Sequence, residues 1–380
     1  MHDIFAVTAP GLEPLAAAEL RDMGIESATP VAGAGGVEFR GNLDSVYRAN
    51  LWLRTASRII VRMGAFRARS FGEIERCSAQ LPWDTFVGAG TRIRLRVTCR
   101  KSRLYHSGAV AQRIAGILEK RGAVLSGLAR TEDEETPDDA QLVIVRLFRD
   151  ECTVSADSSG ELLHRRGYRK DIGKAPIRET LAAAAVMASG WTPESPLMDP
   201  FCGAGTISIE AALVARRIAP GLERRFAFMQ WPNYSSSTWD GQVEEARARE
   251  LPSAPSDLLA SDRDAGAVEA ARANAVRARV SGDIELRQTA LSGIEPPTVT
   301  GYLVTNPPYG VRVGQRAALR NLYAQLGNVS RKKLVGWTIT FISANADLEG
   351  QTRLPLEAVL KTRNGGIGVR VVRALVPGQA

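Results

Sequence analysis

The residues with the clearest chemical potential form the run Asn306-Pro-Pro-Tyr309, directly after the apolar segment Tyr302–Thr305. Two consecutive prolines lack N–H groups and have a fixed φ, so they hold the Asn306 amide and the Pro307 carbonyl as rigid acceptors. Two acceptors that converge on an exocyclic amino group would free the nitrogen lone pair for attack on an electrophile. The Tyr309 ring can stack on a flat base. The run therefore predicts a site that methylates a conjugated amine, with a plain Asn-Pro-Pro turn as the alternative.

A second candidate is the glycine-containing turn from Asp199 to Thr206, between a short apolar segment and a helical pattern. Gly203 and Gly205 allow a ligand to approach the backbone closely, at a helix start whose N–H groups point toward it. A full G-x-G-x-x-G does not follow, which disfavours a pyrophosphate ligand. The turn predicts a nucleoside-type ligand, and a turn needed only for packing is the alternative.

A third candidate, Asp262, follows the apolar segment 258–261. A carboxylate at the end of a second strand can accept hydrogen bonds from both hydroxyls of a ribose. Asp264 is better placed to be the N-cap of the helix expected over residues 265–277. Helix capping is also the alternative role for Asp262.

Each of these three runs lies at the end of an expected strand, in the C-terminal half of the chain, where strands and helices alternate. Strands are expected at 197–199, 258–261, 283–287, 302–305, 334–342, 356–361 and 367–374, and helices at 176–187, 206–217, 265–277 and 317–329. The turn signal Asn364-Gly-Gly366 predicts a terminal hairpin. The pattern predicts an α/β fold with a doubly wound sheet and an antiparallel edge. Residues 220–255, with Trp231, Tyr234 and Trp239, interrupt the alternation and predict an ordered insertion over the sheet edge.

The front half predicts a small α+β unit over residues 1–65, with Asn42 as a helix cap, followed by a second α+β region. Ser70 and Glu73 form a capping box. Strict alternation over residues 92–98 predicts a strand with Ile93, Leu95 and Val97 inward and Arg92, Arg94 and Arg96 outward. A basic loop, residues 100–106, precedes a helix that begins at Ser107 or Gly108. Residues 132–135 form an acidic, solvated loop, and strands are expected at 141–148 and 151–156.

The net charge is +8, and residues 40–121 contain 17 Arg or Lys but only 5 Asp or Glu. This concentration predicts a polyanionic partner, with an arginine-rich solvated surface as the alternative. The four cysteines and three histidines have no metal-site or disulfide spacing. We therefore expect no metal and a cytoplasmic protein. The sequence shows no signal peptide and no apolar run of membrane-spanning length, so no membrane association is expected.

The glycine turn resembles motif I of class I S-adenosylmethionine-dependent methyltransferases, and Asn306-Pro-Pro-Tyr-Gly310 resembles their amino-methylating motif IV. Four further runs resemble THUMP-containing RNA guanine-N2 methyltransferases, especially the N-terminal methyltransferase half of the bacterial bifunctional large-subunit rRNA enzyme and its stand-alone relatives. These runs are Ser102-Arg-Leu-Tyr-His106, Leu163-His-Arg-Arg-Gly-Tyr-Arg169, Ala175-Pro-Ile-Arg-Glu-Thr-Leu-Ala182 and Ile218-Ala-Pro-Gly-Leu222. The resemblance covers nearly the whole chain. It implies a ferredoxin-like domain (1–65), a THUMP RNA-binding domain (66–157) and a Rossmann-like methyltransferase domain (158–380).

The resemblance also implies the roles of individual residues. The target guanine would be held by Asn306, Pro307, Pro308 and Tyr309. S-adenosyl-L-methionine would be bound by Asp199, Pro200, Phe201, Cys202, Gly203, Gly205, Thr206, Asp262, Arg263, Ala290 and Asn306. RNA would be bound by Arg100, Lys101, Arg103, His106 and Arg169. In two places the sequence departs from the family. Gln288-Thr-Ala290 lacks an aspartate found in many relatives, so backbone groups or Gln288 must recognise the adenine, and Val311-Arg312 replaces Glu-Arg.

The expected activity is methylation of guanine N2 in structured RNA, with 23S rRNA as the expected substrate. Guanine-N2 methylation of tRNA is the nearest alternative. Methylation of adenine N6 or of protein glutamine shares the Asn-Pro-Pro-Tyr chemistry but does not explain the basic front half. A non-catalytic RNA-binding factor, in which the glycine turn serves folding alone, is the alternative from another class.

Overall fold

The computed structural model describes residues 1–378 except 32, 34, 130, 132–138, 172–176 and 310–315. The chain divides into two compact units, and neither is a continuous stretch. The first comprises Met1–Thr8, Ala16–Leu163 and Arg224–Glu244, and the second Ala9–Leu15, His164–Glu223 and Glu245–Ala380. No helix among the described residues is both long and apolar enough to cross a membrane.

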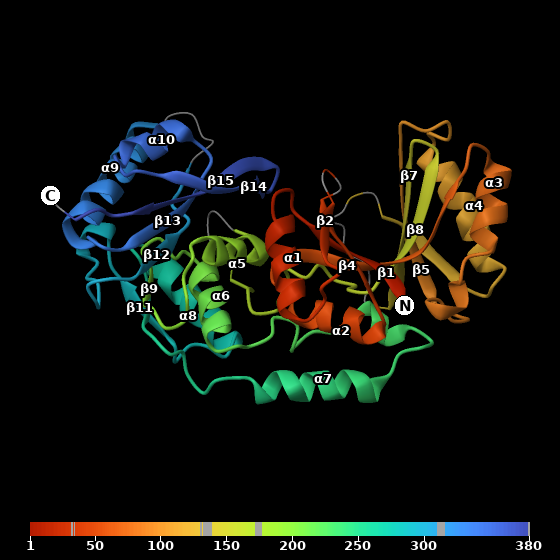
Figure 1. The fold of residues 1–380 in the computed structure, drawn as a ribbon, viewed down its shortest axis with the longest axis horizontal. Helices are drawn as coiled ribbons and strands as arrows, with labels where there is room; N and C mark the ends of the chain where they lie inside the picture. The colour runs from red at the N-terminus through yellow and green to blue at the C-terminus, as the bar shows by residue number, and fades with distance from the viewer. Residues whose placement is uncertain are drawn as a thin grey trace. The chain divides into compact units, whose positions relative to one another are not determined.

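Within the described residues, the first unit contains an eight-stranded mixed sheet in the order β2-β3-β1-β4-β8-β7-β5-β6 (Figure 1). Its strands are β1 (His2–Thr8), β2 (Thr29–Val31), β3 (Gly36–Gly41), β4 (Ala56–Arg67), β5 (Arg92–Arg100), β6 (Val124–Leu128), β7 (Ala140–Phe148) and β8 (Glu151–Asp157). The long strand β4 pairs with β1 on one side and with β8 on the other. One sheet therefore runs through both of the regions that the sequence separates at residue 65.

The helices of this unit start where the local sequence predicts. They are α2 (Leu43–Trp52), α3 (Phe71–Ala79) and α4 (Ser107–Glu119), while α1 (Glu13–Asp22) contributes residues to both units. The Asn42 side chain accepts from Ser45 N at 3.0 Å, so Asn42 caps α2. Both reciprocal hydrogen bonds of the predicted Ser70/Glu73 capping box are present at α3. Local cap chemistry thus sets these helix boundaries. The expected acidic loop at 132–135 lies outside the described residues.

The prediction that Arg96 faces outward is wrong, because its side chain is buried in β5. It lies near the buried carboxylate of Asp157, whose main ion-pair partner is Arg58. Burial raises the pKa of Asp157, and the two arginines oppose that rise. A buried carboxylate requires a compensating positive charge, which explains why Arg96 is buried near Asp157.

The predicted position of the 220–255 insertion over the sheet edge is also wrong, because Arg224–Glu244 belong to the first unit. Trp231 Nε1 donates to Gln141 Oε1 at 2.7 Å, and its ring meets the Phe86 ring edge-on. The Phe228 ring stacks on Tyr47 with centroids 4.4 Å apart. These aromatic contacts bury the insertion against strands and helices formed earlier in the chain.

The second unit contains a sheet in the order β11-β10-β9-β12-β13-β15-β14. Its strands are β9 (Leu197–Asp199), β10 (Leu258–Asp262), β11 (Ile284–Gln288), β12 (Tyr302–Thr305), β13 (Thr338–Ser343), β14 (Glu357–Asn364) and β15 (Ile367–Leu375). The first five in the spatial order are parallel, and the β14–β15 hairpin is antiparallel. The doubly wound sheet and its predicted hairpin edge are confirmed.

The helices associated with this sheet are α5 (Glu179–Ala188), α6 (Thr206–Ala215), α8 (Ala265–Arg277), α9 (Arg316–Lys333) and α10 (Ala346–Gln351), and α7 (Ser236–Ala248) contributes residues to both units. Pro176, the predicted first residue of α5, lies outside the described residues. The sequence pattern did not predict α7 or α10. The cap of α10 was nonetheless present in the sequence, since the Asn345 side chain accepts from Asp347 N at 2.8 Å.

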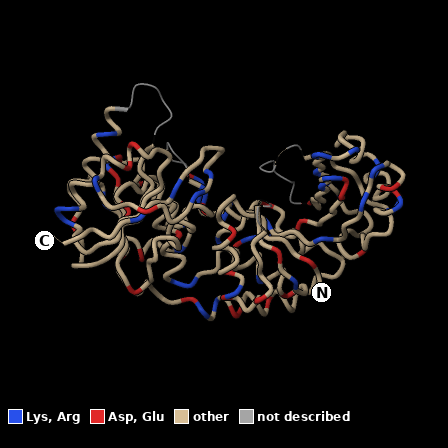
Figure 2. Tube along the Cα trace, turned by 45° about the horizontal axis from the view of Figure 1, so that its top comes forward, with Lys and Arg blue, Asp and Glu red and all other residues tan. Residues whose placement is uncertain are grey.

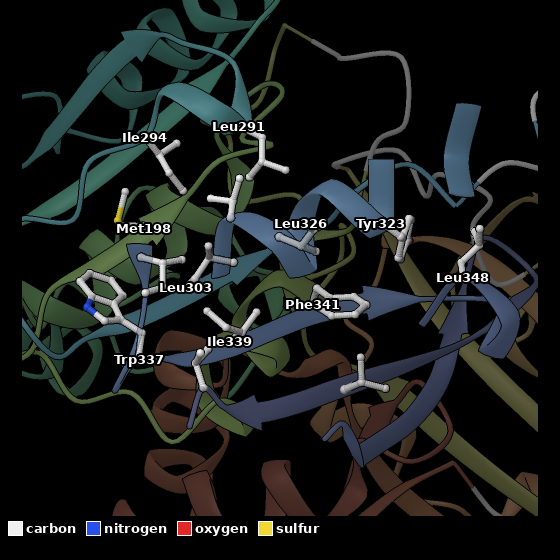
Figure 3. Packing of buried hydrophobic residues seen from close by; sticks show 14 residues of the cluster. Met198, Leu291, Ile294, Leu303, Tyr323, Leu326, Trp337, Ile339, Phe341 and Leu348 are labelled. Atoms are coloured by element: carbon white, nitrogen blue, oxygen red, sulfur yellow. The ribbon is translucent and has the colours of Figure 1, made fainter. Parts of the chain in front are cut away.

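A hydrophobic core lies between α9 and the centre of the sheet (Figure 3). Met198, Leu303 and Ile339 occupy matching register positions on β9, β12 and β13, so they form one row across adjacent strands. Tyr323 and Leu326 of α9 pack on this row. The core fixes the strands whose carboxyl ends carry the predicted chemistry.

We predict that Gly327→Ala destabilises the second unit strongly. A methyl group at Gly327 in α9 would lie 1.8 Å from the carbonyl oxygen of Thr352, so the segment after α10 must move. The expected loss in unfolding free energy is about 1–3 kcal/mol or more. Gly350→Ala is the matched control, because a methyl group there meets nothing within 4 Å. Denaturant unfolding followed by tryptophan fluorescence measures both; equal midpoints for the two variants would contradict this prediction.

Candidate active site

Three loops converge at the carboxyl ends of parallel strands in the second unit. They follow β9, β10 and β12, which are neighbours in the sheet order β10-β9-β12. The chain proceeds outward from β9 to β10 on one side and to β12 on the other, so the loops flank a topological switch point. This is where open α/β sheets bind their ligands.

The Asp199 carboxyl is buried at the end of β9, and it joins two of these loops. Its Oδ1 accepts from Thr305 Oγ1 at 2.6 Å and from Phe201 N at 3.3 Å. Burial raises the pKa of Asp199 to about 7, while these two hydrogen bonds oppose the rise and the nearby Asp262 carboxylate adds to it. The group is therefore poised to ionise near neutral pH when a cation approaches.

The turn after Asp199 uses both predicted glycines. Gly203 has φ +52° and open space where a side chain would stand, and its N–H donates to Asp262 Oδ2 at 3.1 Å. Gly205 has φ +83°, and a Cβ there would lie 3.0 Å from the Cβ of Ala271 in α8. The first glycine leaves the backbone accessible, and the second lets α6 begin at Thr206 against α8.

The remaining turn residues are fixed by burial and by a backbone hydrogen bond to the end of β10. Pro200 is buried and Phe201 half-buried, while Cys202 N donates to the carbonyl of Ser261 at 3.0 Å. Burial raises the pKa of the Cys202 thiol, and the nearby Asp199 carboxyl raises it further. A buried thiol of this kind is a packing group rather than a nucleophile.

Asp262 and Asp264 have separate roles. Asp264 Oδ1 accepts from Gly266 N at 3.0 Å, so Asp264 caps α8 as predicted. Asp262 accepts from Gly203 N through Oδ2 and from Asp264 N through Oδ1, and it does not cap the helix. Its carboxylate therefore lies between the glycine turn and the end of β10, which suits the predicted ribose contact.

The position after β11 is less specific. Ala290 precedes a short 3-10 turn at Leu291–Gly293. The exposed Gln288 side chain approaches the carbonyl of Arg263 at 3.4 Å. Thr289 N donates to the carbonyl of Asp262 at 3.0 Å. These bonds keep the loops after β10 and β11 adjacent, with backbone groups and Gln288 as the available polar partners.

The Asn306-Pro-Pro-Tyr309 run follows β12 next to Asp199. Asn306 Oδ1 is buried and accepts no hydrogen bond from any described residue. Pro307 is buried, whereas Pro308 is exposed. The Asn364 amide donates to Tyr309 Oη at 2.9 Å, so the β14–β15 hairpin holds the ring. Gly310 and Val311-Arg312 lie outside the described residues.

A buried ionic network that the sequence did not predict involves α6, the helix that begins at the glycine turn, and α5. Arg166 forms two hydrogen bonds to Glu210 of α6, at 2.9 and 3.3 Å, and Tyr168 Oη donates to the same carboxylate at 3.0 Å. Arg169 pairs in the same way with Glu179 of α5, at 2.9 and 3.2 Å. Single glutamates inside the alanine-rich helices were the available signal for this network.

The predicted RNA-binding residues divide between the units. Arg100, Lys101, Arg103 and His106 lie together and exposed at the end of β5 and the start of α4. His106 Nδ1 accepts from Ala109 N at 3.1 Å and so caps α4. Arg169 belongs to the second unit, where its guanidinium is engaged by Glu179. Contact of these residues with RNA stays a prediction.

The described residues contain no group of His, Cys, Asp or Glu that could hold a metal ion. What the site offers instead is a glycine turn, a ribose-type carboxylate, a buried carboxyl near its ionisation point and an unused amide acceptor. This set suits an adenosine-type ligand with a cationic tail beside an amine substrate.

Family models and similar proteins place the chain in the same group of methyltransferases. Residues 166–373 match the family described as RMKL-like, methyltransferase domain, and residues 3–60 match the RlmL ferredoxin-like domain. The Synechocystis protein named "Putative RNA methyltransferase slr0064" is 35% identical over 364 residues, which cover 96% of this chain and 94% of that protein.

Two further proteins extend the comparison. The ribosomal RNA large subunit methyltransferase K/L of Syntrophotalea carbinolica is 35% identical over 97% of this chain, which spans only 53% of that longer protein. The solved structure of "SMU.472, a putative methyltransferase complexed with SAH" superposes with a TM-score of 0.87 at 28% identity and covers 100% of this chain and 99% of that one.

We predict that the buried pair Arg166–Glu210 is more costly to break than to remove. Glu210→Leu leaves the Arg166 charge buried and should lower the unfolding free energy by about 3–5 kcal/mol. The double variant Arg166→Met, Glu210→Leu should recover much of that loss. Glu245→Leu, which breaks the exposed pair with Arg249, should cost about 0–1 kcal/mol. Chemical denaturation at pH 7 checks the series, and a double variant no more stable than Glu210→Leu would refute the explanation.

Proposed function

We propose that this chain, which belongs to the RMKL-like methyltransferase family, methylates the N2 amino group of guanine in structured RNA, with 23S rRNA as the substrate. The methyl donor is S-adenosyl-L-methionine, whose demethylated product SAH is bound in the related SMU.472 structure. The observation that carries the chemistry is the buried, unused acceptor Asn306 Oδ1 beside Asp199 and Thr305.

The cofactor pocket is assigned from the glycine turn outward. Residues Asp199–Thr206 would hold the methionine part, with the Asp199 carboxyl facing its ammonium group. Asp262 would accept from the ribose hydroxyls, while Arg263, Ala290 and Asn306 complete the lining. The bound cofactor supplies an electrophilic methyl group, and the open space over Gly203 supports close approach to the backbone.

The chain's own residues then orient the amine. Asn306 Oδ1 and the Pro307 carbonyl would accept the two N–H groups of guanine N2, which aims the nitrogen lone pair at the methyl carbon. Tyr309, held by Asn364, would stack on the extruded base. Such positioning would raise the rate without requiring a strong base, because the methylated nitrogen becomes cationic and acidic and can lose its proton to water.

RNA as the substrate rests on the relatives' names and on the charge of the first unit. Two relatives are named as RNA or ribosomal RNA methyltransferases. Arg100, Lys101, Arg103 and His106 form an exposed basic group, and contacts of this type to phosphates give salt-sensitive affinity. We assign residues 66–157 as the THUMP domain between the ferredoxin-like domain (1–65) and the catalytic domain (158–380). Guanine-N2 methylation of tRNA is the alternative within the class.

We predict that Asn306→Ala abolishes most methyl transfer and weakens S-adenosylmethionine binding much less, because Asn306 is only one of the residues assigned to the cofactor pocket. Loss of one acceptor for the reacting amine should lower kcat about 10²–10³-fold. The assay is transfer of labelled methyl to 23S rRNA, ribosomal particles and tRNA, followed by nucleoside identification. Asn328→Ala is the control, because Asn328 is an exposed residue of α9.

The same assay decides between the alternatives. N2-methylguanosine in rRNA supports the proposal, and the same product only in tRNA moves the substrate assignment. Methyladenosine, or no transfer together with no cofactor binding, would overturn the proposed chemistry.

We also predict that S-adenosylmethionine binding releases a proton near neutral pH. The pKa of Asp199 lies at about 7 because of burial, so a large share of the carboxyl is protonated at pH 6–7. The approaching ammonium favours the ionised form and lowers that pKa. Affinity should therefore rise as pH increases from 6 to 7, and Asp199→Asn should bind weakly without this dependence. Calorimetry in two buffers of different ionisation enthalpy counts the proton; identical heats in both would contradict the assignment.

A further inference from the structure

One face of the sheet in the first unit contains an open hollow far along the chain from the methyl-transfer residues. Its volume is about 260 Å³. It spans four adjacent strands, β1, β4, β8 and β7. The hollow is lined by Phe5, Ile60, Arg62, Ile144, Arg146, Phe148, Glu151, Thr153 and Ser155. Small-molecule sites typically measure about 300–1,000 Å³, so this hollow suits a single flat group rather than a folded element.

Strand register places these side chains together. Arg146 and Phe148 on β7 oppose Thr153 and Glu151 on β8. Arg62 on β4 opposes Ser155 on β8. The alternate residues of β7, such as Val145 and Leu147, are buried in the core. Figure 1 shows α3 and α4 together on one side of β7 and β8. Here the sheet thus has a covered apolar face and an opposite face that carries arginine and aromatic side chains among smaller polar and aliphatic ones.

The aromatic rings in the hollow lie close to guanidinium groups. The Arg62 guanidinium lies 5.2 Å from the Phe5 ring centroid. Phe148 has two such neighbours, Arg146 at 5.8 Å and Arg149 at 5.3 Å. Aromatic rings and guanidinium planes are the two surfaces on which proteins stack unpaired nucleobases. Ordinary cation–π packing accounts for the pairs, but not for a hollow left open between them.

The charge of this face is positive where β5 and β7 meet. Arg62 is neutralised by Glu38 at 2.6 Å, and Glu151 is the acidic residue of the lining. Arg146 forms no ion pair with any residue that the structure describes. Arg100, a predicted RNA contact, is in register with Phe148 on the adjoining strand. Figure 2 shows blue Lys and Arg segments gathered in this part of the molecule.

We propose that this hollow binds an unpaired nucleotide of the RNA substrate, with its base against Phe148 and its phosphate on Arg146 and Arg100. The inference rests on the proposed RNA methyltransferase function. It adds a second RNA contact, far along the protein chain from Asn306–Tyr309, the residues proposed to hold the reacting base. The stacking surface selects single-stranded RNA, and the guanidinium groups supply the phosphate contact. The basic loop 100–106 follows β5, which pairs with β7 at the edge of the hollow. A single RNA strand can therefore contact both the loop and the hollow.

The test is binding of the full chain to a fluorescent single-stranded decauridine, with a ten-base-pair RNA duplex for comparison. Phe148→Leu keeps an apolar side chain but removes the ring, and Arg146→Gln removes the charge. Each should weaken decauridine binding roughly 5- to 100-fold. Arg146→Gln should also lower the salt dependence by about one phosphate contact, whereas Phe148→Leu should leave that slope unchanged.

Arg113→Gln is the matched control, because Arg113 on α4 lies over Phe71 at 5.6 Å in the same unit but outside the hollow. It should bind decauridine like wild type, and all three variants should bind S-adenosylmethionine normally. Equal affinity of Phe148→Leu and Arg113→Gln, or tighter binding of duplex than of decauridine, would overturn this proposal and leave the methyltransferase assignment standing. Failure of the wild-type chain to methylate any RNA would overturn the proposed function itself.

Discussion

The hydrogen bond from Thr305 Oγ1 to Asp199 Oδ1 is the interaction on which the site depends. It joins the carboxyl ends of β9 and β12, where the glycine turn and the Asn306 run begin. Both groups are buried, so the bond has no competing water and fixes the spacing of the two loops. In-line transfer between two bound groups requires such spacing, because a small misplacement is costly. The shape of the site therefore comes from the sheet rather than from the loops.

The charged groups beneath the site extend the same principle. Glu210 and Glu179 are buried in adjacent helices, α6 and α5, and each receives a forked arginine from the connector before them. Such pairs contribute little net stability, but any helix position that separates the partners leaves a buried charge unpaired. The connector thereby specifies how the helix that starts at the glycine turn packs. Specificity of this kind matters most where a loop must hold its geometry without a ligand.

The sequence was a good guide wherever a local signal set the structure. The capping box at Ser70, the strand ends at Asp199 and Asp262 and the hairpin at Asn364 follow from turn and cap chemistry within a few residues. It failed where distant partners decide. Arg96 alternates like an exposed residue, yet the buried Asp157 holds it inside. The location of Trp231 depends on Gln141, ninety positions earlier. The periodicity of apolar and polar residues along the sequence does not indicate such long-range pairings.

The interleaving of the two units has a consequence for the order in which the chain folds. The stretch Arg224–Glu244 completes the first unit, although β9 and α6 of the second unit come before it. During synthesis, Tyr47 and Gln141 lack their aromatic and hydrogen-bonding partners until this stretch has left the ribosome. All segments of the first unit are then outside the ribosome, while β10 to β15, including the strand before Asn306, have still to leave it. Because segments of the two units alternate along the chain, no single cut of the backbone separates one unit from the other.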